Sequence, residues 1–396
     1  MGNPWPFVIA VAVLSLLSPH PSLVFTVYAL ACFLIVVHKG AEDAFRGLLV
    51  RYDLRRGTGF AGEELSVKIS LQNRSRFPVF WYIMSHLFPA QLGAEADKVV
   101  GCLPAKGRVE HVIRFRGRGR GIYKLPATAI VCGDAWGLYN KSFSGQCPED
   151  IVIYPPVRKI VGLTLERRLP QGRQRVLCGL YEDPSRMRGC RGYRPSDHLK
   201  RLHWPNIART GSLQVKEWET TLHADTALFL NLREEDYPVR SWSLLLESGV
   251  ELAASLCCLL LSRGDDLGFY SNGAAAEDKK SAPFCLPPKR GENQGRQILT
   301  YLAGADLGKD ADNAFFWKEA ARLAAGSSLV FITPGITPGM AAGLGGLRRS
   351  GRRPAVLWLA GGDGELCAGD LKRFRIPWYA VEKRRDDNVF CCFRKG

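Results

Sequence analysis

Ser196, Asp197, His198 and His203 are the residues that first suggest catalysis, because serine, aspartate and histidine together form hydrolase triads. A triad needs a nucleophile and a base that meet in space, usually from separate segments, beside an oxyanion hole. Neighbouring side chains of an extended segment point apart, and the sequence contains no Gly-x-Ser-x-Gly elbow. We therefore expect no catalytic residue here. Asp197 is predicted to pair with nearby arginines, and Trp204 to pack into the core.

Cofactor and zinc motifs are also missing from the sequence. The glycine-rich run 339–346 lacks both the Lys-Ser/Thr of a phosphate-binding loop and the spacing of a dinucleotide fingerprint. The twelve cysteines include no Cys-x-x-Cys pair, the spacing that zinc sites use. We expect no cofactor, no small-molecule substrate and no enzymatic activity.

Basic residues are concentrated in one segment. The formal net charge is +16, and residues 158–216 hold fourteen Lys and Arg against four Asp and Glu, a net +10. Such a segment favours an anionic partner, which could be nucleic acid, a membrane surface or an acidic protein. We interpret residues 156–220 as a basic connector.

The N-terminus predicts a membrane anchor. Residues 5–17 and 23–37 are apolar, a Ser-Pro-His-Pro-Ser break separates them, and no charged residue precedes Lys39. One unbroken helix of this length would exceed the ~30 Å hydrocarbon core, so residues 1–38 are predicted to form a transmembrane hairpin. Lys39, Arg46 and further arginines come next, which places the rest of the chain on the cytoplasmic side of the cell membrane.

A second apolar run, residues 244–261, is predicted to be a buried core helix. It contains Glu247 and Glu251, and each carboxylate would cost about 2.5–3.5 kcal/mol at a bilayer centre. The two residues are four apart, so we expect them on one wet stripe of the helix.

The soluble part predicts two domains of different class. Residues 39–155 show period-two alternation, as in Leu65-Ser66-Val67-Lys68, and fit an antiparallel β-sandwich of about seven strands. Residues 221–396 alternate short apolar strands (226–232, 266–270, 328–333, 355–360, 377–381) with helices (241–262, 293–303, 314–325, 338–349). This alternation is typical of a parallel sheet covered on both faces. The expected fold class is a multidomain α+β chain.

The basic connector also carries a recognisable motif. Its residues are Arg191, Tyr193, Arg194, Pro195, Asp197, Arg201, His203, Trp204, Ala208, Arg209 and Thr210. The run resembles the signature of the domain-of-unknown-function-58 family, although Ser196 stands where glycine is usual. Gly-Arg-Gly-Ile-Tyr at 119–123, Gly-Asp-Ala-Trp-Gly-Leu at 133–138 and Val-Ile-Tyr-Pro at 152–155 extend the resemblance over nearly the whole chain.

The resemblance implies an architecture and a partner. Members of the family look like a membrane hairpin, a β-sandwich and an α/β domain similar to the von Willebrand factor type A fold. They are associated with AAA ATPases of the MoxR class, proposed to assemble envelope or other complexes, so other membrane or envelope proteins are further expected partners. The signature residues are then structural or partner-binding.

Type A domains often hold a divalent cation through Asp-x-Ser-x-Ser after the first strand. Here that stretch reads Asn231-Leu232-Arg233-Glu234-Glu235, and a later strand ends in Ile332-Thr333-Pro334. Arg233 puts a cation where an oxygen ligand is needed. We expect a degenerate site at Asn231, Arg233 and Glu235, with no metal.

The leading hypothesis is a membrane-anchored interaction protein that works with a MoxR-type AAA ATPase and the lipid bilayer. The first alternative is a nucleic-acid-binding protein that uses the basic connector. The second alternative is an enzyme of unrecognised type.

Overall fold

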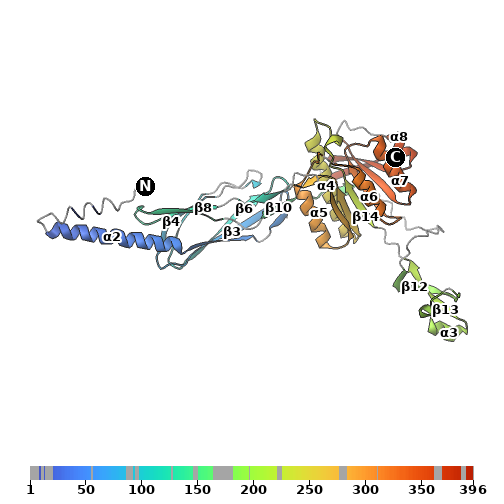
Figure 1. The fold of residues 1–396 in the computed structure, drawn as a ribbon, viewed down its shortest axis with the longest axis horizontal. Helices are drawn as coiled ribbons and strands as arrows, with labels where there is room; N and C mark the ends of the chain where they lie inside the picture. The colour runs from blue at the N-terminus through green and yellow to red at the C-terminus, as the bar shows by residue number, and fades with distance from the viewer. Residues whose placement is uncertain are drawn as a thin grey trace. The chain divides into compact units, whose positions relative to one another are not determined.

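A computed structural model describes residues 9, 13, 21–54, 57–85, 92–93, 98–125, 128–145, 150–163, 182–195, 197–220, 225–275, 283–309, 311–360, 368–384 and 389–395. The chain divides into two compact units, Met1–Pro156 and Val157–Gly396 (Figure 1).

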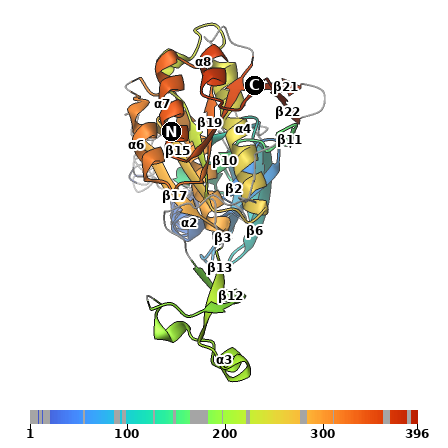
Figure 2. The ribbon, with the colours of Figure 1, turned by 90° about the vertical axis from the view of Figure 1, so that its right-hand side faces the viewer.

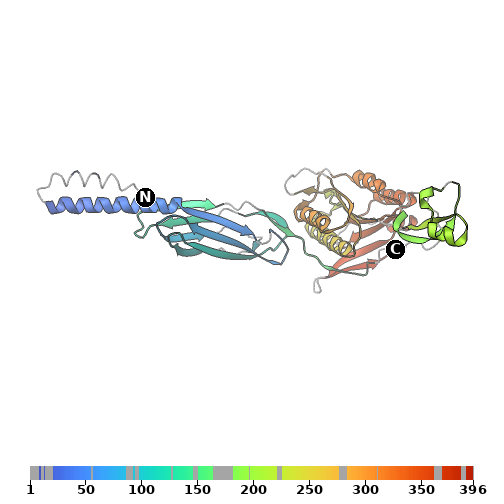
Figure 3. The ribbon, with the colours of Figure 1, turned by 90° about the horizontal axis from the view of Figure 1, so that it is seen from below.

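The first unit begins with the helix α2, Pro21–Arg46. The first arm of the predicted hairpin, residues 5–17, lies outside the described residues except for Ile9 and Val13. The helix does not end near residue 38, where we placed the domain boundary, but continues for two more turns. Those turns are stabilised because Ala41, Ala44 and Phe45 are buried in one hydrophobic cluster with the strands of the same unit. Figure 3 shows the carboxyl end of α2 beside these strands. The apolar arm and the strand domain are therefore joined by one continuous helix.

In the described part of this unit, ten strands come after α2: β1 (Leu48–Leu54), β2 (Thr58–Phe60), β3 (Glu64–Asn73), β4 (Val79–Ser85), β5 (Lys98–Leu103), β6 (Arg108–Arg116), β7 (Gly121–Lys124), β8 (Thr128–Gly133), β9 (Asn140–Gly145) and β10 (Asp150–Tyr154). They form sheets in the orders β1-β3-β6, β5-β4-β8-β9 and β2-β10-β7. These ten strands pair antiparallel, except for the parallel pair β2 and β10.

The predicted alternation in β3 fits the core of this unit. Leu65, Val67, Ile69 and Leu71 are all buried, and they share one hydrophobic cluster with side chains of β4, β8 and β10. Successive side chains of a strand point to opposite faces, so this pattern buries one face of β3. The sheets β1-β3-β6 and β5-β4-β8-β9 thus enclose a common core as an antiparallel sandwich.

The second unit contains an eight-stranded sheet in the order β11-β22-β21-β20-β19-β14-β15-β17. Its strands are β11 (Lys159–Val161), β14 (Thr226–Leu230), β15 (Leu267–Ser271), β17 (Phe284–Lys289), β19 (Ser328–Thr333), β20 (Arg353–Leu359), β21 (Trp378–Arg384) and β22 (Val389–Arg394). β15, β14, β19, β20 and β21 run parallel to one another, whereas β17 and β22 pair antiparallel with β15 and β21. The short pair β16 (Ala274–Ala275) and β18 (Ala305–Asp306) lies apart from this sheet. The sheet is mixed. β17, β22 and β11, which runs parallel to β22, are additions to the expected parallel core.

Helices cover both faces of this sheet (Figure 2). They are α4 (Trp242–Ser262), α5 (Glu292–Gly304), α6 (Ala314–Arg322), α7 (Pro338–Arg349) and α8 (Ala368–Arg373). α6, α7 and α8 share a cluster with Phe229 and Phe331. Gly249 of α4 lies close to Leu230 and Leu359. Leu230 and its neighbour Phe229 point to opposite faces of the sheet, so α4 lies on the face opposite α6, α7 and α8. The prediction of helices on both faces is confirmed.

Two described helices are long and apolar enough to cross a membrane. Only 17% of the residues in the apolar stretch within 24–46 are buried, whereas 72% are buried in the apolar stretch of α4. α4 is therefore a core helix, as expected. Glu247 is exposed as predicted, but the prediction that Glu251 is also exposed to water is wrong. Glu251 is buried because it binds Arg158 Nε at 2.6 Å and Lys383 Nζ at 2.9 Å. α2 is the helix available for membrane association.

The predicted connector 156–220 is folded in its described parts. β11 joins the edge of the eight-stranded sheet, parallel to β22. β12 (Glu182–Gly192) and β13 (Gln214–Thr220) form an antiparallel pair, and between them lie the 3-10 helix η2 (Leu199–Arg201) and α3 (Trp204–Thr210) (Figure 2). We call the segment from β12 to β13 the signature hairpin, because it holds every signature residue.

Candidate functional site

The turn of the signature hairpin is closed by one carboxylate. Arg191 donates from Nη1 to Asp197 Oδ2 at 2.7 Å and from Nη2 to Asp197 Oδ1 at 2.6 Å. The backbone N–H of Arg194 donates to Asp197 Oδ2 at 2.9 Å. The hydrogen bonds from Arg191 and then from the Arg194 amide lower the pKa of Asp197 to about 2. The predicted pairing of Asp197 with arginine is present, and it fixes the carboxylate as an anion.

His203 has a structural role at the start of α3. Its Nδ1 accepts a hydrogen bond from the Asn206 amide at 3.1 Å, which caps the helix. Gly211 ends α3 with φ at 68°, a left-handed conformation that glycine adopts without a steric penalty. Among the described residues Asp197 binds Arg191 and His203 binds Asn206, so these two do not form an acid–base pair. Ser196 lies outside the described residues.

Trp204 does not pack into the core, so that prediction is wrong. The indole is 67% exposed, and Leu199 and Leu213 of the same hairpin are also exposed. The cause is the size of the hairpin, in which two strands and one seven-residue helix bury Leu202 and Val215 but no residue of α3. The hairpin thus has no core large enough for an indole.

The remaining signature residues lie on the same hairpin. Arg194, Pro195, Ala208, Arg209 and Thr210 are exposed, while Tyr193 and Arg201 are half-buried. Lys200 adds a further exposed cation beside Leu199. The hairpin therefore presents large apolar side chains and basic side chains together, which is the composition of many protein-binding surfaces.

A second cluster of polar residues lies at the carboxyl edge of the eight-stranded sheet. Asn231, Asn272 and Thr333 each follow or end one of the strands β14, β15 and β19, and all three are buried. The carboxyl ends of parallel strands meet at one edge, and the sheet order reverses at β14. This is the position at which open α/β sheets bind ligands.

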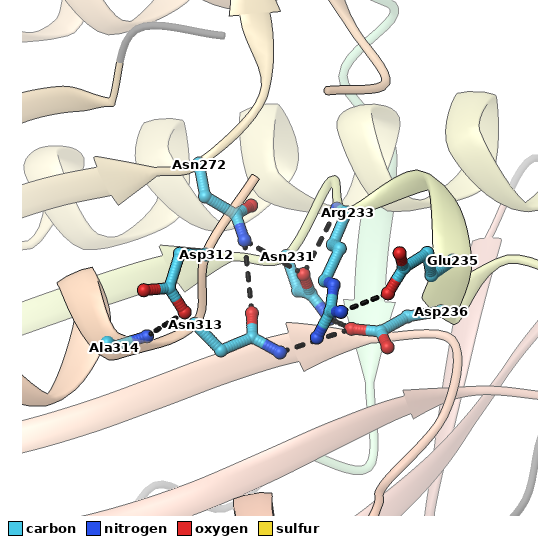
Figure 4. A network of polar contacts seen from close by, with 8 residues as sticks. All are labelled: Asn231, Arg233, Glu235, Asp236, Asn272, Asp312, Asn313 and Ala314. Carbon is cyan, nitrogen blue, oxygen red and sulfur yellow. Dashed lines mark hydrogen bonds and ion pairs between the residues drawn. The ribbon is translucent and has the colours of Figure 1, made fainter. Parts of the chain in front are cut away.

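Hydrogen bonds within the chain occupy this edge (Figure 4). Asn231 Nδ2 donates to Asp236 Oδ2 at 2.7 Å and to Thr333 Oγ1 at 3.2 Å. Asn231 Oδ1 accepts from the Arg233 amide and from Asn272 Nδ2, both at 3.2 Å. Asn272 Nδ2 also donates to Asn313 Oδ1 at 3.1 Å. We call these residues the edge network.

The edge network is unsuited to a cation. The Arg233 guanidinium forms an ion pair with Glu235, and Asp236 Oδ2 accepts from Asn231 and Asn313. Oxygen atoms that accept N–H bonds and lie near a guanidinium are poor ligands for Mg²⁺ or Ca²⁺. Among the described residues no three His, Cys, Asp or Glu side chains group as metal ligands.

Sequence reasoning missed three members of the edge network: Asp236, Asn272 and Asn313. Asn272 could have been found, because it lies two residues after the strand expected at 266–270. Asp236 ends the 3-10 helix η3 (Glu234–Asp236), and Asn313 directly precedes α6. The positions of both depend on the folded domain, so the sequence held no comparable signal for them.

Comparisons with known proteins add one distant relative. No protein-family model matches the chain. The chain is 22% identical over 275 residues to the Uncharacterized protein YeaD of Bacillus subtilis (strain 168). The match covers 65% of this chain and 65% of YeaD. The chain thus spans just under two thirds of the length of that relative.

Two solved structures show weak likenesses to this chain. Proximal thread matrix protein 1 from the mussel byssus is 10% identical with a TM-score of 0.29, over 38% of this chain and 41% of that chain. An exo-β-N-acetylglucosaminidase of family GH20 from Vibrio harveyi is 9% identical with a TM-score of 0.20, over 78% and 76%. Scores of this size carry no argument about fold or function.

Proposed function

We propose that this chain is a membrane-anchored interaction protein of the domain-of-unknown-function-58 type, whose signature hairpin docks a protein partner. The observation that carries the proposal is the exposed Trp204 on a hairpin held in shape by the Arg191–Asp197 pair. Tryptophan and arginine are the side chains most enriched among the residues that dominate binding energy at interfaces. A fixed turn lowers the entropic cost of presenting them.

The partner we propose is a MoxR-type AAA ATPase, which follows from the resemblance of the signature. The exposed cations Arg194, Lys200 and Arg209 favour a partner surface with acidic residues around an apolar pocket. No enzymatic activity is part of the proposal, since the Asp197 and His203 side chains are already engaged within the hairpin. Work on envelope or other complexes would then be done through the ATPase.

The rest of the architecture supports a tethered adaptor. α2 supplies an exposed apolar helix for the bilayer, and Lys39 and Arg46 near its carboxyl end favour the cytoplasmic side for the domains beyond it. We propose the von Willebrand factor type A class for the second unit, supported by β14 between β15 and β19 and by the edge network at the expected cation position.

The test is capture of the purified MoxR-type ATPase of the same organism by the full-length chain in detergent, with and without ATP. We expect capture by the wild type and about a tenfold or larger loss with Trp204→Ala. Trp242→Ala is the matched control, because Trp242 is an exposed tryptophan outside the hairpin. Absence of capture by the wild type in both nucleotide states would contradict the proposal.

The nucleic-acid alternative predicts binding that depends strongly on salt concentration. Six or more phosphate contacts would weaken binding roughly 10³-fold between 50 and 200 mM salt. A gel shift with this salt dependence that is lost in Arg194→Gln and Arg209→Gln would favour nucleic acid over the ATPase.

A further inference from the structure

The turn between β8 and β9 presents apolar side chains on a rigid frame. Asp134, which is buried, accepts from the Tyr139 amide at Oδ1 (2.8 Å) and from the Trp136 amide at Oδ2 (3.4 Å). Gly137 completes the turn with φ at 71°. At its tip Trp136 is 57% exposed and Leu138 is also exposed. The fold therefore holds an indole in a fixed place outside the core.

This turn lies against α2 within the same unit. The ring centroids of Trp136 and Phe33 are 5.0 Å apart in an edge-on arrangement, and those of Tyr139 and His38 are 4.6 Å apart. The exposed Phe80 of β4 also lies near Trp136, at 6.4 Å between ring centroids. The depth of α2 in a bilayer therefore also sets the depth of this turn.

The sequence of α2 indicates what that depth is. The apolar run ends at Val37, and Phe33 precedes Lys39 by six residues, about 9 Å along the helix axis. Lys39 belongs with the lipid headgroups or with water, so Phe33 lies on the hydrocarbon side of it. Trp136, in contact with Phe33, would then lie in the layer between headgroups and acyl chains, which tryptophan prefers.

Basic side chains lie beside the carboxyl-terminal part of α2. The Phe77 ring packs on Gly40, since a Cβ at Gly40 would be 3.2 Å from Phe77 Cδ1. Phe77 belongs to the β3–β4 turn, in which Arg74 and Arg76 are exposed. The Arg74 amide donates to the Gly47 carbonyl at 2.9 Å, so this turn runs beside the chain from Gly40 to Gly47. Aromatic side chains at the level of Phe33 and cations between the levels of Gly40 and Gly47 match the order of acyl boundary and anionic headgroups in a bilayer.

We infer that Trp136, Leu138 and Phe80 form a membrane-facing lip that inserts into the lipid interface beside α2, with Arg74 and Arg76 on the headgroups. The lip rests on the proposed membrane anchoring by α2. Its consequence is that the sandwich is held at a fixed orientation against the bilayer and does not swing on a flexible tether. The occupant of this surface is lipid of mixed zwitterionic and anionic composition.

The test is tryptophan quenching in the full-length chain, reconstituted in phosphatidylcholine–phosphatidylglycerol vesicles with and without lipids brominated near the headgroup end of the acyl chains. We expect brominated lipid to quench the wild type more than Trp136→Phe. Trp242→Phe is the matched control, an exposed tryptophan of the second unit, and should be quenched like the wild type. A second reporter, Phe80→Trp, should increase the quenched signal.

Equal quenching of the wild type and Trp136→Phe, with no increase in Phe80→Trp, would overturn the lip. Protection of Trp136 from aqueous iodide without quenching by brominated lipid would also overturn it, because a protein would then cover the surface. Failure of the anchor itself is distinguishable, since alkaline carbonate would release the wild-type chain from the vesicles.

Discussion

Arg191 binds both carboxylate oxygens of Asp197 across the turn of the signature hairpin, with N–O distances of 2.6 and 2.7 Å. A bidentate pair fixes the relative orientation of its two partners as well as their distance. Asp197 also accepts from the Arg194 amide, so one carboxylate joins the end of β12 to the turn that precedes η2. The most polar part of the signature is therefore a device that shapes the hairpin.

The acidity of Asp197 should be visible in its titration. The pKa lies at about 2 because Arg191 and the Arg194 amide stabilise the anion, so the hairpin keeps this contribution at neutral pH. As pH falls below the ordinary value of 3.8 the contribution declines, and it is lost as pH passes through about 2. The Arg194 amide proton resonance should follow this transition. Asp197→Asn should abolish the transition, and a wild-type midpoint near 3.8 would contradict the pair.

The buried carboxylate of Glu251 should be important for the second unit. It binds Arg158, which precedes β11, and Lys383 of β21. Glu251→Gln leaves two cations without their anion, and we expect the free energy of unfolding to fall by about 3 kcal/mol. Urea unfolding measures this change. Glu247→Gln, on an exposed position of the same helix, should change it by less than ~0.5 kcal/mol. Equal effects of the two variants would contradict this role of Glu251.

The edge network predicts that divalent cations do not change the stability of the second unit. Its Asn231 and Asp236 oxygens accept N–H bonds and its Arg233 guanidinium pairs with Glu235. Because a ligand that binds only the folded state raises its stability, millimolar Mg²⁺ or Ca²⁺ should leave the melting temperature unchanged. Thermal unfolding after treatment with a chelator, and again after adding each ion, makes the comparison. A rise of several degrees that disappears in Asn231→Ala would show that the edge binds metal.

The junction between α2 and the sandwich depends on Gly47. A Cβ at this position would lie 2.7 Å from the backbone nitrogen of Ser75, which cannot move aside like a flexible side chain. Gly47→Ala should therefore destabilise the unit by about 1–3 kcal/mol. Gly119→Ala is the control, because its Cβ would meet only Tyr123 at an ordinary 3.7 Å. Chemical denaturation in detergent compares them, and a neutral Gly47→Ala would indicate a looser junction.

Local patterns predicted many elements within a few residues. The ranges expected for β19 and α7 match those observed, and α4 was placed within one residue of its start. These segments have clear periodicity or clear ends. Thr337 caps α7 and Pro338 opens it, both recognisable without knowledge of the rest of the fold. Helix–sheet alternation then sufficed to predict an α/β unit.

The edge strands of the sheet were harder to predict. β17 contains Pro287 and Pro288, which usually argue against a strand, and the three-residue β11 at the other edge is too short to show a pattern. Prolines are tolerated at an edge, where one side of the strand has no partner in the sheet. Whether a segment is an edge strand depends on which strands pair with it, and those strands can be distant in the sequence.

The sequence by itself determined where many of the helices and strands form, which face of several of them is apolar, and that the N-terminal region holds an apolar helix. Those properties depend on neighbours a few residues away. Only the tertiary structure decided the environment of particular side chains. Glu251 is buried because Arg158 and Lys383 reach it, while Trp204 is exposed because its hairpin has no core to receive it. Burial and pairing are set by the residues that fold around a side chain, and a local pattern does not contain them.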